Sequence, residues 1–380
     1  MASDLRLRRT YRYRIYPTVR LRQALEAQLG FACQLYNAAL EERRYAWRGR
    51  RRSVTLYEQF RELTAVRAAK MGPPNMSCSA MRDPLRRLDR AYAAYFRRVK
   101  AGVKPGYPRF RSTRRYDSLT WASGWAVRNG RLVLQGVGQV KVNWHRSLPV
   151  AAVVRTVTVR RAAERWYVCF SLHLPTSPRV PAMPLPAVGL DLGIHYFATL
   201  STGEQLPGPR AYRAAKSPLR IAQRRMARRQ KGSHRRYQAR LLLARKHERI
   251  RNLRYDHAHK LTRRLVSDFG FIAVEDLNVR GLVSGSLAKD VTDQGWAAFL
   301  TMLEYKAAEA GTRLIRVPPH GTSQICSGCG FVVPNVLSER THRCPECGLV
   351  IDRDTNAARN ILRLGLSRQA ITWPTGACVA

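Results

Sequence analysis

Two cysteine pairs near the C-terminus constrain the fold of this chain more than any other feature. Cys326 and Cys329 form one Cys-x2-Cys pair, and Cys344 and Cys347 form a second after fourteen intervening residues. Four thiolates at this spacing are typical of a closed, tetrahedral structural zinc site. A glycine follows each pair and suits the tight turns whose backbone N–H groups point at sulfur. The sequence therefore predicts a ribbon at 322–350 that holds one Zn²⁺ ion.

Three carboxylates lie in apolar or helical segments around this ribbon. Asp191 lies within the apolar run VGLDLGI (188–194), Glu275 ends the run FGFIAVE (269–275), and Asp354 opens a helical segment behind the second cysteine pair. A buried carboxylate without a partner is costly, and a divalent cation supplies a partner. An acid on a first strand, a later strand and a last helix is the order of an RNase H-like nuclease. Such sites bind two Mg²⁺ ions about 3.5–4 Å apart.

Each acid has an alternative interpretation. For Asp191 the alternative to a metal ligand is a structural salt bridge. As a metal ligand it would have space for a substrate backbone beside it, because Gly189 and Gly193 flank it.

Asp276 competes with Glu275, although strand alternation places Glu275 on the same face as the apolar residue two positions earlier. Asp354 could be a plain helix N-cap, and Asp352 competes with it for either role. The favoured catalytic and Mg²⁺-binding set is Asp191, Glu275 and Asp354.

The charge of the chain predicts a polyanionic partner. There are 68 Lys and Arg residues against 25 Asp and Glu, which gives a formal charge of +43. Residues 213–264 read as a basic helical hairpin with a break near 232–233, and they contain 19 basic residues and two acids. A solvated hairpin is the alternative, but so few acids favour contact with a phosphate backbone. The candidates for nucleic-acid binding are Arg224, Arg225, Arg228, Arg229, Lys231, Arg235 and Arg236.

The N-terminal half reads as strands interrupted by helices. A short alternating strand is followed by a helical segment over 18–100, broken around 72–74, and then by further strands. Because the opening strand needs partners, we expect residues 1–17 and 101–178 to form one β-barrel around the helical insertion. A proline-rich stretch, 179–187, predicts a linker.

The C-terminal half is predicted to be an RNase H-like, RuvC-type nuclease domain formed by 188–321 and 351–366, with the zinc ribbon inserted in it. Residues 367–380 are predicted to be a tail. The fold class is therefore multidomain α+β. No signal peptide or membrane span is evident in the sequence, and the remaining cysteines show no disulfide framework. We expect a cytoplasmic protein of a prokaryotic cell, with no membrane partner.

Aromatic residues alternate with basic ones in several predicted strands. Tyr11, Tyr13, Tyr16, Trp121 and Trp125 are the clearest examples. Such side chains stack on bases in many nucleic-acid-binding proteins. The same alternation is equally typical of an ordinary barrel core, so the sequence leaves both interpretations open.

Five segments of the chain resemble one known family. VGLDLGI, VEDLNV, the ribbon TSQICSGCG…CPECG (322–348), DRDTNAARNI (352–361) and GYPRFR (106–111) look like the TnpB proteins of insertion sequences, which are relatives of the type V CRISPR effectors. The resemblance spans nearly the full length and is strongest from 188 to 362.

The resemblance implies an RNA-guided DNA endonuclease, in which a transposon-derived guide RNA directs cleavage of double-stranded DNA beside a short target-adjacent motif. Asp191, Glu275 and Asp354 would be the RuvC triad, and the four cysteines the zinc ligands. The barrel and the helical insertion would be the wedge and recognition parts. Base pairing would supply most of the sequence specificity.

Two other functions stay open from the sequence. One is an RNA-guided DNA-binding repressor that has lost cleavage, which the complete acid set disfavours. The other is a transposase that performs strand transfer. Transposases of this superfold generally carry Glu on the last helix, so Asp354 and the inserted ribbon disfavour that alternative.

Overall fold

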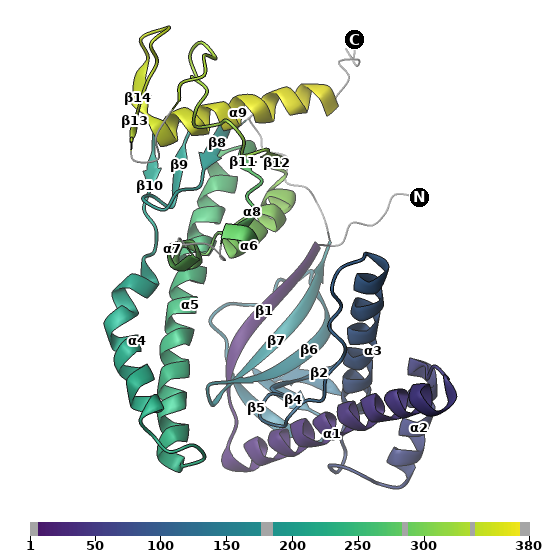
Figure 1. The fold of residues 1–380 in the computed structure, drawn as a ribbon. Coiled ribbons are helices and arrows are strands. Elements are labelled where there is room, and N and C mark those ends of the chain that lie inside the picture. The colour runs from purple at the N-terminus through teal and green to yellow at the C-terminus, as the bar shows by residue number, and fades with distance from the viewer. Residues whose placement is uncertain (1–6, 176–184, 283–287, 335–338, 373–380) are drawn as a thin grey trace. The chain divides into compact units, whose positions relative to one another are not determined.

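The chain folds into two compact units, residues 1–176 and 177–380. The structure is a computed structural model, and it describes residues 7–175, 185–282, 288–334 and 339–372 (Figure 1). Each unit has its own hydrophobic core, and the fold is mixed α+β, as predicted. Most of the proline-rich linker predicted at 179–187 lies outside the described residues. No helix within the described ranges is long and apolar enough to cross a membrane.

The first unit is built on a seven-stranded antiparallel sheet with the strand order β2-β6-β7-β1-β5-β4-β3. Its strands are β1 (Leu7–Tyr16), β2 (Ser118–Trp121), β3 (Trp125–Arg128), β4 (Arg131–Leu134), β5 (Gly138–Asn143), β6 (Val153–Ala162) and β7 (Arg165–Leu174). The opening strand, β1, pairs with β5 and β7. The two edge strands, β2 and β3, are joined by residues 122–124 alone, so the sheet must curve back on itself. Among the described strands, no ladder between β2 and β3 closes it into a complete barrel.

The aromatic side chains of this sheet mostly belong to its core. Tyr13 and Trp121 are fully buried in the core of the first unit, so neither ring can stack on an external base. Tyr11 and Trp125 are partly buried against the same core. Of the five candidates, Tyr16 alone is well exposed. Of the two interpretations that the sequence left open, the structure supports an ordinary sheet core for Tyr13 and Trp121, because the strand register turns them inward.

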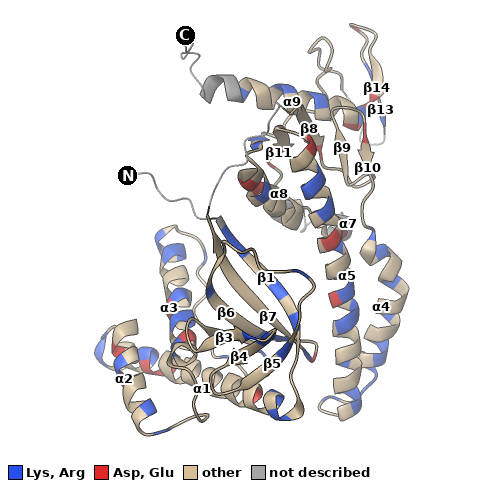
Figure 2. Cartoon of the chain, turned by 180° about the vertical axis from the view of Figure 1, so that it is seen from behind, with Lys and Arg blue, Asp and Glu red and all other residues tan. Residues whose placement is uncertain are grey.

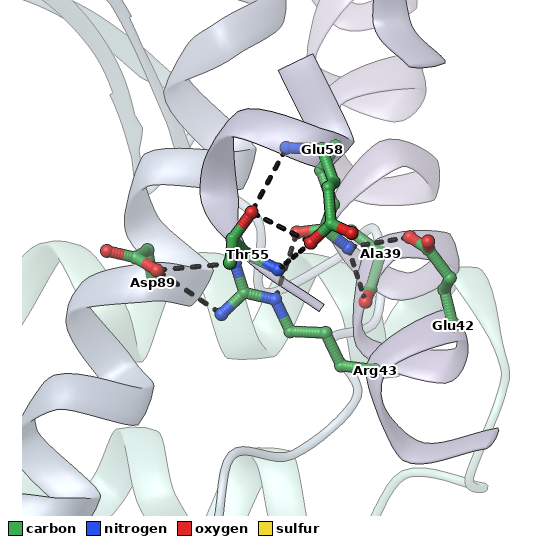
Figure 3. Close-up of polar contacts among 7 residues, drawn as sticks. Ala39, Glu42, Arg43, Thr55, Glu58 and Asp89 are labelled. Carbon is green, nitrogen blue, oxygen red and sulfur yellow. Dashed lines mark hydrogen bonds and ion pairs between the residues drawn. The ribbon is translucent and has the colours of Figure 1, made fainter. Parts of the chain in front are cut away.

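Three helices interrupt the sheet between β1 and β2: α1 (Val19–Arg50), α2 (Leu56–Ala68) and α3 (Cys78–Lys100). The break predicted around 72–74 separates α2 from α3. A second break, between α1 and α2, was not predicted. There Arg51 adopts a left-handed conformation, and Thr55 and Glu58 form a capping box that starts α2 (Figure 3). The Thr-x-x-Glu spacing of this box was readable in the sequence.

A buried arginine joins the three helices (Figure 3). The Arg43 side chain of α1 donates to Gln59 Oε1 of α2 at 3.0 Å and to Asp89 Oδ1 of α3 at 3.2 Å. Gln59 Nε2 in turn donates to Ala39 O at 3.0 Å and to Glu42 Oε2 at 2.7 Å. Buried charges and amides need such partners. Arg43 therefore holds the insertion together and is not part of a free basic surface.

The second unit is built on a five-stranded sheet with the order β10-β9-β8-β11-β12. Its strands are β8 (Ala187–Asp191), β9 (Ala198–Leu200), β10 (Gln205–Leu206), β11 (Phe271–Glu275) and β12 (Arg313–Val317). β8, β11 and β12 are parallel, whereas β9 is antiparallel to both of its neighbours. β8 ends at Asp191, earlier than the predicted run to residue 194. Asp191 and Glu275 are therefore the last residues of two neighbouring parallel strands.

Helices cover both faces of this sheet (Figure 1). The helices of the second unit are α4 (Ala211–Ala227), α5 (His234–Asp268), α6 (Val279–Leu282), α7 (Ala288–Gln294), α8 (Trp296–Ala310) and α9 (Arg353–Thr372). Of these, α5 and α8 cover one face of the sheet and α9 covers the other. Ile272 and Val274 of β11 belong to the core formed with α5 and α8, whereas Phe271 and Ala273 pack with Ile361 of α9. Alternate residues of one strand thus face opposite helical layers. Because α9 continues to Thr372, residues 367–372 are helical and not part of a tail.

Two glycines let α9 lie close against the sheet. A β-carbon at Gly189 would lie 2.1 Å from Ala358 O, and one at Gly365 would lie 2.6 Å from Ala273 Cβ. Either contact would force α9 away from the strands. The space beside Gly189 is therefore filled by α9, and the expectation that this glycine leaves room for a substrate backbone is wrong.

The predicted ribbon lies between β12 and α9 along the chain. Its second half forms a two-stranded antiparallel sheet of β13 (Thr341–Arg343) and β14 (Val350–Asp352). β14 ends at Asp352, and α9 begins at the next residue. The position of this ribbon therefore determines directly where the first turn of α9 begins.

Candidate functional site

The structure brings the three predicted acids of the second unit together. Asp191 ends β8 and Glu275 ends β11, each one residue beyond the paired Leu190 and Val274. Asp354 lies in the first turn of α9. Burial raises the pKa of Asp191 well above its ordinary value, and the negative charges of Glu275 and Asp354 raise it further. Three carboxylates that repel one another in a buried place form a site suited to cations.

Glu275, not Asp276, is the acid that faces the interior. Glu275 is 7% exposed, and Thr322 Oγ1 donates a hydrogen bond of 2.5 Å to its Oε1. Burial raises the pKa of Glu275, and this hydrogen bond opposes the rise. The Asp276 side chain is 63% exposed and forms an ion pair of 3.1 Å with Arg316. The alternation of the strand thus identified the inward-facing acid.

The two acids that open α9 have different roles. Asp352 Oδ1 accepts a hydrogen bond of 3.0 Å from the backbone N–H of Thr355, so Asp352 caps the helix. Asp354 is buried, and its carboxylate lies 3.4 Å from Arg340 Nη1 and 3.6 Å from Arg353 Nε. Asp354 also raises the pKa of Asp191 more than Asp352 does. Asp354 is therefore the acid more closely associated with the site.

The four cysteines come together in the ribbon, as predicted. Their sulfur atoms all lie within 4.8 Å of one another, with Cys326 and Cys347 at 3.6 Å and Cys329 and Cys344 at 3.5 Å. A tetrahedral zinc ion with Zn–S bonds of about 2.3 Å requires sulfur atoms about 3.8 Å apart. The four side chains therefore fit a closed zinc site.

Backbone N–H groups favour the thiolate form of Cys326. Burial raises the pKa of Cys326, but hydrogen bonds, the largest from the backbone of Cys329, outweigh it and lower the pKa to about 6. A thiolate is the form that binds zinc. Cys329 differs: despite a backbone hydrogen bond from Phe331, burial and the neighbouring cysteines raise its pKa to about 12.

The Gly328 N–H lies 3.4 Å from the Cys326 sulfur. The donor here is Gly328, which lies inside the pair. The glycines that the sequence singled out, Gly330 and Gly348, have positive φ angles of 85° and 71°, as tight turns require.

The acid site differs from the cysteine cluster in geometry. Among the described residues, the cysteines form a cage around one point, and the three carboxylates do not form a comparable cage for a single ion. Oxygen ligands suit Mg²⁺, which also keeps several water molecules when it binds to proteins. In a two-metal site each ion contacts only some of the carboxylates. The donor chemistry of the three acids therefore fits Mg²⁺.

Two asparagines that the sequence did not single out connect α9 to the ribbon. Asn356 Oδ1 accepts from the Ser327 N–H at 2.8 Å, and its Nδ2 donates to Ile325 O at 2.8 Å. Asn360 Nδ2 donates to Thr322 O at 2.9 Å and to Ile325 O at 2.6 Å. Asparagine is a poor helix former, and residues four apart share one helix face. Two asparagines four residues apart in a predicted helix were therefore a sign, readable in the sequence, that this helix face makes specific polar contacts.

Basic residues gather on the predicted hairpin, which the structure forms from α4 and α5 (Figure 2). Two shallow hollows lie at its turn. One is lined by Ile221 with Arg224, Arg225, Arg228 and Arg229. The other is lined mainly by Arg225, Arg229, His234, Arg235 and Gln238. Lys231 is also exposed in the turn. Hollows lined by several guanidinium groups suit phosphate oxygens.

Arg236 differs from the other candidates on the hairpin. Its Nη1 donates to Met226 O at 3.1 Å and to Arg229 O at 2.7 Å, and thereby satisfies carbonyl groups at the end of α4. Its backbone N–H donates to Ser233 Oγ, which caps α5. Arg236 therefore stabilises the turn between the two helices. This structural role accounts for an arginine at this position without any contact to nucleic acid.

Related proteins cover almost the whole chain. A protein of Streptomyces pristinaespiralis named "Putative RNA-guided DNA endonuclease" is 37% identical over 375 residues, which cover 96% of this chain and 91% of that protein. InsQ of Escherichia coli, with the same description, is 31% identical over 75% of this chain and 74% of its own length. The chain belongs to the TnpB family.

Three family models match parts of the chain. The model described as "Probable transposase" matches residues 170–285, and the model "Cas12f1-like, TNB domain" matches 296–361. A model described as "Helix-turn-helix domain" matches 4–52. In this TnpB-family chain the described residues of that last segment form β1 and the single long helix α1. The segment is therefore not a pair of helices.

Solved structures share the fold. A Cas12f1 chain from a complex with sgRNA and target DNA matches with a TM-score of 0.59 and 13% identity, and the match covers 94% of this chain and 98% of that chain. The mini-RNA-guided endonuclease CRISPR-Cas_phi3 matches with a TM-score of 0.50 and 9% identity, over 95% of this chain and 92% of that chain. At these sequence identities the similarity establishes only the fold of this TnpB-family chain.

Proposed function

We propose that this chain is an RNA-guided DNA endonuclease encoded by a transposable element, which cuts DNA beside a short target-adjacent motif. One observation carries the mechanism. Asp191 and Glu275 end the neighbouring parallel strands β8 and β11, and Asp354 lies in the first turn of α9, which packs on the same strands. The strand order β10-β9-β8-β11-β12 supports an RNase H-like, RuvC-type nuclease domain.

The three carboxylates would share two Mg²⁺ ions. When bound, Mg²⁺ supplies an activated water and stabilises the charge on the leaving 3′ oxygen. The chain holds the carboxylates at the ends of rigid elements, which limits their movement during the reaction. Because the pKa of Asp191 is raised, cations compete there with a proton. Cation binding should therefore be coupled to the release of protons from this site.

The cysteine cluster would hold one structural Zn²⁺ ion. The strand β14 of the ribbon ends directly at α9, and Asn356 and Asn360 fasten the helix to the segment around the first cysteine pair. The ribbon would therefore keep the first turn of α9, and with it Asp354, in a fixed position. Its proposed contribution to cleavage is indirect.

Guide RNA and double-stranded target DNA are the proposed partners. The formal charge of +43 supports binding to polyanions. The arginine-lined hollows of the hairpin are candidate phosphate contacts. We propose that the sheet and the helical insertion of the first unit act as wedge and recognition parts. Most sequence specificity would come from base pairing between guide and target.

Cleavage by the purified protein with its copurified RNA tests this proposal. Matched DNA that carries the adjacent motif should be cut only when Mg²⁺ is present. Asp191→Ala, Glu275→Gln and Asp354→Asn should abolish cutting and leave RNA and target binding nearly unchanged, because each removes only a metal ligand. Asp352→Asn is the matched control, since it alters the helix cap but not the proposed metal ligands.

The outcomes separate the alternatives. Target binding without cutting by the parent protein would instead indicate a repressor, and joining of DNA ends would indicate a transposase. Normal cutting by Asp354→Asn together with an inactive Asp352→Asn would show that the roles at the start of α9 are reversed.

A further inference from the structure

We infer that Thr322 is a positioning residue for Glu275, whose carboxylate it holds in the orientation required for metal binding. The inference rests on the proposed function, since it assigns a supporting residue to that site. Thr322 lies in the segment between β12 and the first cysteine pair, far from Glu275 along the chain. Nothing in its sequence context marked it as part of the site.

The hydrogen bond between the two side chains is short and buried. Thr322 Oγ1 lies 2.5 Å from Glu275 Oε1, and the two residues are 4% and 7% exposed. The same hydroxyl lies 3.5 Å from Pro319 O, but it has one proton to donate, and the carboxylate is closer. Hydrogen bonds to ionised acceptors are stronger than neutral ones. This bond fixes one carboxylate oxygen and leaves the other available for a cation.

The backbone of Thr322 is itself held by α9. Its carbonyl oxygen accepts from Asn360 Nδ2 at 2.9 Å, and the same amide group also donates to Ile325 O. The contacts thus run from α9 through Asn360 to Thr322 and on to Glu275. α9 also carries Asp354, so one helix sets the positions of two acids that come from different elements. A rigid distance between these acids is what two shared cations require.

A second buried threonine provides a matched control. Thr312 is 7% exposed and lies in the same unit, and its hydroxyl donates to Val266 O and Phe269 O at 3.3 and 3.1 Å. Its partners are carbonyl groups, not a carboxylate. Thr312→Val therefore removes a buried hydroxyl of the same kind without touching the proposed metal site.

Binding of Mn²⁺, followed by the EPR signal of the free ion, tests the inference separately from cleavage. The full chain with its RNA is titrated with Mn²⁺ in the parent, Thr322→Val, Thr322→Ser and Thr312→Val forms. Loss of a residue that orients a metal ligand typically costs about 10–100-fold in affinity or activity. We expect that loss in Mn²⁺ affinity for Thr322→Val, and an equal rise in the Mg²⁺ concentration that half-saturates cleavage.

The conservative variant and the control decide between positioning and mere packing. Thr322→Ser keeps the hydroxyl and should bind Mn²⁺ nearly as the parent does. Thr312→Val should lower thermal stability and leave Mn²⁺ affinity unchanged. If Thr322→Val does not fold, Thr322→Ala gives the same test without an added methyl group against the carboxylate. Parental Mn²⁺ affinity in the variant that lacks the hydroxyl, or equal losses in the Ser and Val variants, would overturn the inference.

Glu275→Gln distinguishes failure of this inference from failure of the proposed function. If Glu275→Gln weakens Mn²⁺ binding but Thr322→Val does not, the acid site stands and the role of Thr322 is wrong. If Glu275→Gln itself binds Mn²⁺ like the parent, Glu275 is not a metal ligand. In that case the proposed two-metal mechanism and the role of Thr322 fall together.

Discussion

Replacement of Asn356 by alanine should weaken the attachment of the ribbon to α9 without removing its metal. The Asn356 side chain is fully buried, and it satisfies both the Ser327 N–H and the Ile325 carbonyl. In Asn356→Ala the Ile325 carbonyl keeps its bond from Asn360, so only the Ser327 N–H loses its partner. A buried backbone group left without a partner costs about 1–3 kcal/mol. Structural zinc contributes about 10–16 kcal/mol in zinc-finger peptides. The ribbon should therefore stay folded around zinc while its attachment to the helix is weakened.

The expected result is a protein with normal zinc, lower stability and slow cleavage. For a domain of this size, 1 kcal/mol corresponds to about 2–4 °C in melting temperature, so the second unit should melt at least about 2 °C lower. An active-site group displaced by about 1 Å can cost about 100-fold in rate. Metal analysis, calorimetry and Mg²⁺-dependent cleavage of matched DNA measure the three quantities.

Two further variants sharpen this test. Asn356→Asp keeps the acceptor for the Ser327 N–H but places a buried carboxylate oxygen against the Ile325 carbonyl, so it should destabilise the second unit at least as much as alanine does. Asn37 makes the same pair of bonds in the first unit, to the backbone N–H and carbonyl of Arg111. Asn37→Ala should therefore leave the melting of the second unit unchanged. Unchanged melting and cleavage in Asn356→Ala, or loss of its zinc, would refute the reasoning.

Three further outcomes are expected. Cys347→Ser should lose the single zinc ion and most cleavage although all three acids remain, and full cleavage by a demonstrably zinc-free variant would show that the ribbon is an independent module. Charge reversal of four hairpin arginines, Arg224, Arg225, Arg228 and Arg229, should weaken nucleic-acid binding. It should also flatten the slope of log affinity against log salt concentration by about 0.7–0.9 per lost contact. An unchanged slope would mean that these arginines form a solvated face of the hairpin and do not contact phosphates. Because the folded state raises the pKa of Asp191, the metal-free protein binds extra protons when folded and loses stability as pH rises through that pKa. Asp191→Asn should therefore raise the melting temperature of the metal-free protein at neutral pH, by a margin that disappears towards about pH 4, the pKa of an unfolded Asp; a pH-independent margin would contradict this.

Metal-site geometry was the part of the structure most readable from sequence. Cysteine pairs encode their site through spacing alone, because two tight turns bring four sulfur atoms together. The distinction between Glu275 and Asp276 was also readable, since neighbouring strand residues face opposite sides. The structure buries Glu275 and exposes Asp276. In both cases the deciding information was local to a few residues.

Contacts between distant segments were not readable. Asp352 and Asp354 are equally good caps in sequence, and the backbone at the start of α9 decides that Asp352 accepts the Thr355 N–H. The space beside Gly189 depends on a helix that begins far along the chain. Tyr13 alternates with arginines in a pattern shared by barrel cores and base-stacking surfaces, and only the strand register resolves it.

The composition of DRDTNAARNI follows from three demands on one short helical stretch. Residues 354, 358 and 361 recur at helical spacing: Asp354 contributes to the acid site, Ala358 approaches Gly189, and Ile361 packs on the sheet. Asn356 and Asn360, on another face, hold the ribbon. The group of residue 358 that approaches Gly189 is its backbone carbonyl, so a side chain at position 189 would push the helix off β8 and carry Asp354 with it. The close contact between this motif and β8 is therefore necessary to the proposed catalysis, because it fixes the distance between Asp354 and the strand that carries Asp191.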